Sequence, residues 1–199
     1  MNKTKIQLSA EEMKLVQNGE WILTKNRVIA KVYAMFGDLA AGMQTYISGN
    51  SDLLPENVIA STAKISKGEQ YEGLPYVMLD YPRCFGKQEI VAVRTFFWWG
   101  NYFSITLQLG GRFLQACRIR VEANLKNEVN GDYFICINDA PWEHHFEESN
   151  YQSLKTIDSI ETILNKPFIK IAKRHSLSEW NDAATFYRSN YENLLQLMY

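Results

Sequence analysis

The stretch from Glu89 to Gly111 constrains the fold more than any other part of the sequence. Two runs rich in β-branched and aromatic residues, 90–99 and 102–109, flank the pair Gly100-Asn101. A Gly-Asn pair between two such runs is typical of a tight β-hairpin, because glycine adopts the positive φ angles that these turns require. We therefore expect an antiparallel sheet built around a hairpin that spans residues 90–109.

The N-terminal part of the chain predicts helix. Ser9 and Glu12 stand at the spacing of a capping box, in which each side chain accepts the backbone N–H of the other residue. Over residues 20–47 apolar positions recur every seven residues, which predicts an amphipathic helix of roughly 40 Å at 1.5 Å per residue. Small residues over 37–42 favour close packing of this helix against the sheet or another helix, with room for a ligand as the alternative.

The C-terminal end predicts another helix, preceded by a second capping-box sequence from Ser176 to Glu179. Residues 112–127 fit either a helix or a strand, and their length favours the helix. Residues 76–82 predict a strand that Pro82 ends, whereas the punctuated segment 49–75 predicts a functional loop or a wrapping connection.

These patterns together predict the fold class and the domain organisation. Helices at both ends and a strand-rich middle are typical of an α+β protein. We expect a single domain over residues 1–199, with a mainly antiparallel sheet of four or five strands centred on 90–109. The long N-terminal helix and the C-terminal helix are expected to pack on this sheet.

Composition excludes several functional classes. The net charge is −1 with 22% charged residues, so no basic surplus indicates nucleic-acid binding. No apolar stretch has the length of a membrane span, and no apolar segment of a signal peptide follows the N-terminus. Three cysteines without paired spacing fit a reducing compartment. We therefore expect a cytoplasmic protein with no cofactor and no nucleic-acid or membrane partner.

Arg94 is the first candidate for a functional role. If residues 100–101 form a two-residue turn, Trp98 pairs with Phe103 and Arg94 falls on the apolar core face of the hairpin. A buried arginine keeps its charge and needs a partner, and Asp80 is the nearest carboxylate if its strand pairs with the hairpin. A structural ion pair that sets the strand register is one interpretation.

An anion-binding pocket is the functional interpretation. Arg94 and Arg83 would face a carboxylate or phosphate, and aromatic side chains would form the walls. The predicted ligand-binding residues are Asp80, Arg83, Arg94, Phe96 and Trp98. On this basis we expect a non-enzymatic protein that binds a small anionic ligand or a protein partner.

An enzyme is the alternative, because metal-ligand and acid–base residue types gather between Asp139 and Glu148. A hydrolase would use Asp139, His144, His145 and Glu147, with or without a metal. The H-E-x-x-H pattern is missing, and His144 and Glu148 are the metal candidates because i, i+4 residues share one helix face. A homodimeric interaction protein without a ligand is the third hypothesis.

Overall fold

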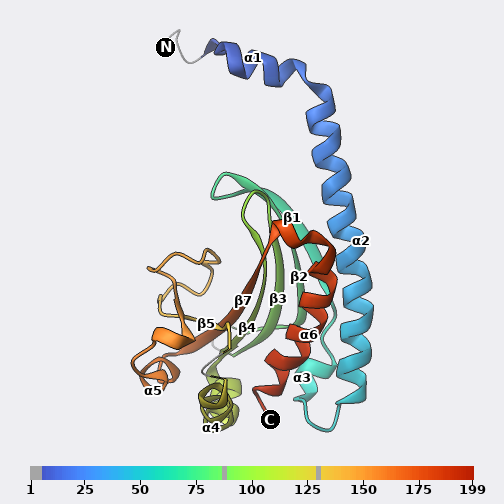
Figure 1. The fold of residues 1–199 in the computed structure, drawn as a ribbon. Coiled ribbons are helices and arrows are strands. Elements are labelled where there is room, and N and C mark those ends of the chain that lie inside the picture. The colour runs from blue at the N-terminus through green and yellow to red at the C-terminus, as the bar shows by residue number, and fades with distance from the viewer. Residues whose placement is uncertain (1–5, 87–88, 129–130) are drawn as a thin grey trace.

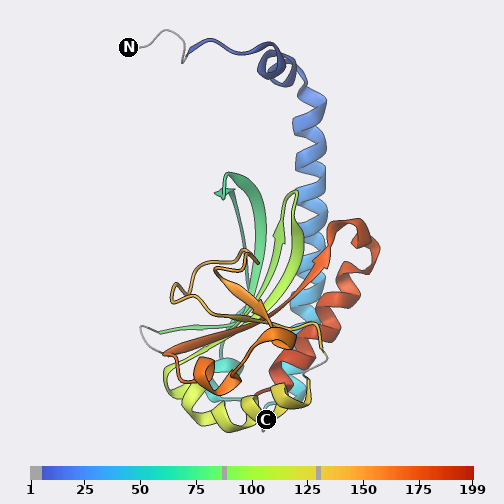
Figure 2. The same ribbon diagram turned by 60° about the vertical axis from the view of Figure 1, so that its left-hand side comes forward.

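The computed structural model describes residues 6–86, 89–128 and 131–199. These residues form one antiparallel sheet of seven strands in the order β1-β2-β3-β4-β7-β5-β6. Helices α2 and α6 cover one face of the sheet, and the segment 137–150 lies over the other (Figures 1 and 2). The α+β class and the antiparallel sheet are thus confirmed, although the sheet has more strands than the four or five predicted.

Seven strands and four further α-helices follow α2 in the described part of the chain. The strands are β1 Lys64–Tyr71, β2 Leu74–Phe85, β3 Ile90–Trp98, β4 Tyr102–Gly110, β5 Phe134–Cys136, β6 Tyr151–Ser153 and β7 Phe168–Ser176. The helices are α3 Glu56–Ile59, α4 Gly111–Asn127, α5 Ile160–Leu164 and α6 Ala183–Gln196, with short 3-10 helices η2 Leu154–Thr156 and η3 Leu177–Asp182. The helix predicted over 112–127 is confirmed as α4.

Two helices form the N-terminal part. Helix α1, Ala10–Gln17, begins at the predicted capping box, where Ser9 Oγ accepts the Glu12 N–H at 3.2 Å and Glu12 Oε2 accepts the Ser9 N–H at 2.7 Å. Helix α2, Gly19–Gly49, confirms the predicted long helix. None of the helices in the described ranges combines the length and apolar character that crossing a membrane requires.

The seven-residue recurrence of α2 is the stripe that meets the sheet. Ile29, Phe36 and Met43 are buried, whereas Ile22, one repeat earlier, is 52% exposed. The first turns of α2 therefore run past the packed body of the protein, and together with α1 they project beyond the sheet (Figure 1). We call residues 6–23 the N-terminal arm.

Three local predictions are wrong. The segment 49–75 is not a loop throughout, because it contains strand β1, which pairs with β2. The polar sequence of β1 gave no sign of this strand. Strand β2 continues through Pro82, because Pro82 lies where the β2–β3 ladder is interrupted and no ladder hydrogen bond is needed. Ser176 Oγ accepts the Ser178 N–H at 3.2 Å, so a 3-10 turn replaces the predicted second capping box.

The central hairpin is confirmed, but its predicted register is wrong by one residue. Trp98 pairs with Tyr102 and not with Phe103, so residues 99–101 form a three-residue loop with Gly100 at φ 73°. Three-residue hairpin loops with glycine at positive φ are common. Because side chains alternate along a strand, a shift of one residue reverses the face assigned to β4 relative to β3.

The predicted core face of the hairpin is consequently corrected. Arg94 pairs with Thr106, and these two residues lie on the face away from α2 and α6. The helix-covered face carries Val93 and Phe97 of β3 together with Leu107 of β4, all buried in the main hydrophobic core. Arg94 is therefore not in the centre of the apolar core, although it is largely enclosed.

Tyr187 and Tyr191 of α6 are both buried in this core, and their hydroxyl groups differ in hydrogen bonding. Tyr187 Oη donates to the Phe96 carbonyl at 2.9 Å, whereas the buried Tyr191 Oη has no partner among the described atoms. We expect Y187F to lower the free energy of unfolding by about 1 kcal/mol, because it removes a buried hydrogen bond. Y191F should leave stability unchanged or raise it, as measured by urea unfolding; equal losses in both variants would contradict this assignment.

Candidate functional site

The candidate site centres on a paired arginine. Strands β2 and β3 place Asp80 opposite Arg94, and two parallel hydrogen bonds join them: Nε to Oδ1 at 2.7 Å and Nη2 to Oδ2 at 2.9 Å. The side chains are only 15% and 8% exposed. The prediction that Asp80 partners Arg94 is confirmed, and the geometry is that of a bidentate arginine–carboxylate pair.

His144 completes the surroundings of Arg94. Arg94 Nη1 lies 2.8 Å from His144 Nε2. Arginine has no acceptor, so Nε2 must accept and the imidazole must be neutral. Burial, followed by the charges of Arg94 and Lys170, holds the pKa of His144 well below its usual range. Each of the three guanidinium nitrogens of Arg94 therefore has a partner within the chain.

The segment 137–150 is fastened over this face of the sheet. Tyr71 Oη accepts the His144 N–H at 2.7 Å and the His145 N–H at 3.0 Å, and Asn150 Nδ2 donates to the His145 carbonyl at 2.6 Å. Lys170 Nζ donates to the Glu143 carbonyl. These bonds connect residues from three separate parts of the chain, so the segment closes the polar face of the sheet.

The predicted aromatic walls face other side chains. Phe96 and Trp98 both meet Tyr71 edge-on, with ring centroids 5.5 and 5.0 Å apart. Trp98 also packs against Tyr102 at 5.5 Å. Both residues are buried, so they line the closed space under the segment 137–150 and contribute to its packing. Their role as walls of a ligand site stays a prediction.

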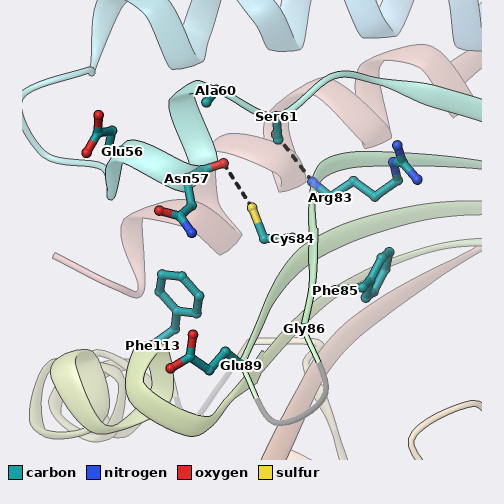
Figure 3. Close-up of a pocket in the computed structure, with 10 residues that line it drawn as sticks. All are labelled: Glu56, Asn57, Ala60, Ser61, Arg83, Cys84, Phe85, Gly86, Glu89 and Phe113. Atoms are coloured by element: carbon teal, nitrogen blue, oxygen red, sulfur yellow. Dashed lines mark hydrogen bonds between the residues drawn. The ribbon is translucent and has the colours of Figure 1, made fainter.

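Arg83 lies in different surroundings from Arg94. It borders an open pocket of about 520 Å³ at the edge of the sheet, together with Asn57, Cys84, Glu89 and others, whose lining does not include Arg94. Figure 3 shows the Arg83 side chain directed away from Cys84 and Asn57. Cys84 Sγ donates to the Asn57 carbonyl at 3.0 Å. The structure thus does not bring the two predicted anion-binding arginines together in one pocket.

The chemistry of the edge pocket does not resemble an anion site or a thiol active site. Glu56 and Glu89 place carboxylates on its wall, which disfavour an anion. Burial raises the pKa of the Cys84 thiol, so the neutral, less nucleophilic form is favoured.

Of the residues of the enzyme alternative, only His145 and Glu147 approach each other, with Nδ1 4.0 Å from Oε2. Asp139 pairs with Lys166 at 2.8 Å, and His145 Nε2 lies 3.4 Å from Glu143 Oε2. His144 is engaged by Arg94, whereas Glu148 borders a separate hollow beside Arg174. The residues 143–146 form neither helix nor strand, so the expected shared helix face of His144 and Glu148 is missing. Within the described ranges no group of three metal-ligand side chains occurs.

Lys170 is the buried charged residue that sequence reasoning missed. Its side chain is fully enclosed, its Nζ lies 5.1 Å from the centre of the Tyr151 ring, and burial lowers its pKa. The local signal was the alternation along β7, in which Lys170 shares a face with Phe168 and Ala172. That pattern places the lysine on an inward face only when the segment 137–150 is known to cover it.

The N-terminal arm is the other distinctive surface. All eight residues of α1 are exposed. Of the large apolar side chains that are exposed in the described part of the chain, eight belong to the arm: Ile6, Leu8, Met13, Leu15, Val16, Trp21, Ile22 and Leu23. Their exposed fractions range from 36% to 78%. Exposed large apolar side chains that gather in one segment mark an interaction site more often than those scattered singly over a surface.

Most small residues of the predicted patch in α2 lie on its outer face. Apart from the adjoining residues and the nearby backbone of α2 itself, no described atom lies within 4 Å of the position that a Cβ would take at Gly37 or Gly42. Of the predicted patch, Ala40 packs against the hydrophobic core, whereas Gly37, Ala41 and Gly42 are exposed, so the predicted close packing is met in part only. The exposed part does not cut back a closed cavity, because it faces outward. It is an open surface of the longest helix.

Comparisons with known proteins give no identification. No protein-family model matches the chain, and neither curated proteins nor solved structures gave a match. The functional conclusion therefore depends on the residues and their geometry.

The Asp80–Arg94 pair yields a stability prediction. D80N leaves the Arg94 charge largely enclosed and only partly compensated, so the free energy of unfolding should fall by about 3 kcal/mol. Replacing both residues by apolar ones of similar size, D80L/R94M, should lose less than half as much, because no uncompensated charge remains. Urea unfolding of the wild type, D80L, R94M and D80L/R94M completes the cycle; a double variant as unstable as D80N would refute this interpretation.

His144 yields a pH prediction. Its folded-state pKa is lowered, so below about pH 6.5 the unfolded chain takes up a proton that the folded chain does not. Stability should therefore be unaffected by His144 above pH 7 and should decrease as the pH falls toward 5, by at most about 1.4 kcal/mol per pH unit. H144Q should flatten this dependence, whereas H175Q retains His144 and should keep it. Unfolding curves between pH 5 and 8 measure the effect, and an unchanged slope in H144Q would contradict it.

Proposed function

We propose that this chain is a non-catalytic, protein-binding protein and that the N-terminal arm is its partner-binding element. The observation that carries the proposal is that the N-terminal arm exposes eight large apolar side chains, of which Trp21 also packs against Trp99 with ring centroids 5.8 Å apart. A segment with this many exposed large apolar side chains is characteristic of a surface that another protein covers.

The isolated helix α1 supports the same conclusion. Helices shorter than about twelve residues are marginal in water, because nucleation is unfavourable and each turn adds little. Yet α1 has eight residues, two satisfied N-terminal backbone donors and an acidic first turn. Capping and charge placement stabilise α1 locally, and burial of its apolar residues against a partner would supply the stabilisation that eight residues alone lack.

The residues on the polar face of the sheet favour a binding role over a catalytic one. Arg94 is engaged by Asp80 and His144, so an anion would have to displace one of them. Among the predicted acid–base residues, Asp139 pairs with Lys166 and His144 with Arg94, which leaves only His145 and Glu147 near each other. The three cysteines are free thiols, two of them buried. The free thiols fit the reducing cytoplasm, which is where we place the protein.

Site-specific photo-crosslinking in cells tests the proposal. A photoreactive phenylalanine derivative replaces Val16 in the arm, which is 69% exposed, or Ile119 in α4, which is 83% exposed and serves as the matched control. We expect a discrete crosslinked protein species for position 16 and none for position 119, because only the arm is covered by a partner. Absence of a discrete product at position 16, or the same pattern at both positions, would exclude the arm as a partner-binding element.

A further inference from the structure

A hollow between the segment 137–150 and the last strands of the sheet has no role in the proposed function. Its volume of about 660 Å³ is in the range of pockets that bind small molecules. None of its lining residues belongs to the N-terminal arm, and the arm projects beyond the body that contains the hollow (Figures 1 and 2). The lining includes three aromatic and two oppositely charged side chains: Phe134, Phe146, Tyr151, Glu148 and Arg174.

Three aromatic rings form the apolar part of the hollow. Phe146 stacks on Tyr151 with ring centroids 4.6 Å apart, and it meets Phe134 edge-on at 5.1 Å. Tyr151 is buried and fixes the position of the stack, whereas Phe134 and Phe146 are only partly buried. The two partly buried rings therefore leave apolar surface for an aromatic group of a ligand, which prefers offset-stacked or edge-on contacts.

Arg174 lies against the same rings and has no anionic partner. Its Cζ is 5.0 Å from the centre of the Phe134 ring and 5.6 Å from that of Phe146. Within the described residues, no carboxylate lies within 4.0 Å of this guanidinium. Each guanidinium nitrogen of Arg94 has a partner in the chain, whereas the donors of Arg174 are held beside the rings without an acceptor. A guanidinium in this state suits a ligand carboxylate, which it can bind through two parallel hydrogen bonds.

Glu148 places the opposite charge in the same hollow. Its side chain is exposed and, in the described part of the chain, has no cationic group within 4.0 Å. Glu148 and Arg174 thus line one hollow without forming an ion pair, and the remaining lining side chains are neutral. A ligand with a single charge is attracted by one of the two residues and repelled by the other. A ligand with both charges is attracted by both.

We infer that this hollow binds a free amino acid with an aromatic side chain. Arg174 binds the α-carboxylate, Glu148 binds the α-ammonium group, and the ligand ring packs on Phe134 and Phe146. These three groups are the ones that a free aromatic amino acid carries on a single carbon atom. A residue inside a protein chain is excluded, because its two peptide bonds remove both charges. The inference does not depend on the role of the N-terminal arm.

Isothermal titration calorimetry of the full chain with L-phenylalanine tests the inference. We expect saturable binding. Phenylalanine amide lacks the carboxylate and phenylpropionate lacks the ammonium group, so each should bind about tenfold more weakly or worse. L-alanine keeps both charges but lacks the ring and should also bind more weakly. The inference is overturned if L-phenylalanine, L-tyrosine and L-tryptophan all fail to bind at millimolar concentration, or if the amide and phenylpropionate bind as tightly as L-phenylalanine.

Two variants assign the charged contacts, and two others serve as matched controls. R174Q and E148Q should each weaken the binding of L-phenylalanine by about tenfold. Both side chains are exposed, so neither replacement should impair folding, which urea unfolding checks. R188Q and E192Q make the same replacements at exposed residues of α6 and should bind L-phenylalanine as the wild type does.

Titration of these variants with the ligand analogues separates direct contact from an indirect effect. R174Q should not weaken the binding of phenylalanine amide, because the amide has no carboxylate contact to lose. E148Q should likewise not weaken the binding of phenylpropionate, which has no ammonium group. Wild-type affinity for L-phenylalanine in both R174Q and E148Q, or an equal loss in R188Q and E192Q, would overturn the assignment of the hollow.

Discussion

An arginine inside a protein cannot release its charge, and the arrangement of the polar face of the sheet follows from that constraint. Arg94 needs acceptors on several sides of its guanidinium group. Asp80 provides two from the neighbouring strand, and His144 provides one from a segment fifty residues away in sequence. The ion pair thereby connects the register of β2 and β3 to the position of the segment 137–150. His144 can serve only as the neutral imidazole, so the closed face also depends on the protonation state of one residue.

The sequence predicted the Asp80–Arg94 pair correctly although it placed Arg94 on the wrong face. The reason is that the two predictions depend on different parts of the chain. The pairing of β2 with β3 does not depend on the hairpin loop, whereas the face shared by β3 and β4 depends on whether that loop has two residues or three. Gly100-Asn101 is compatible with both lengths. One residue in the loop therefore decided which β4 side chains surround Arg94.

The elements with a strong period were predictable, and the contacts that enclose the candidate site were not. Helix α2 has a seven-residue apolar recurrence, and α1 has a complete capping box, so local sequence was sufficient for both. Strand β1 is polar and half exposed, and no alternation revealed it. Lys170 bonds to Glu143, 27 residues away, and a lysine in a strand is expected to reach solvent unless a distant segment covers it. Such long-range contacts leave no periodic signal in a single sequence.

The same distinction explains why the sequence did not predict the arm as a binding site. In the sequence, Ile22 continues the heptad of Ile29, Phe36 and Met43, and nothing local shows that the body ends one turn after it. Only the structure shows that the stripe is buried from Ile29 onward and exposed at Ile22. A chain that folded only for itself would gain nothing from large apolar residues beyond its own core. Their position beyond that core is accounted for when a partner protein covers the arm.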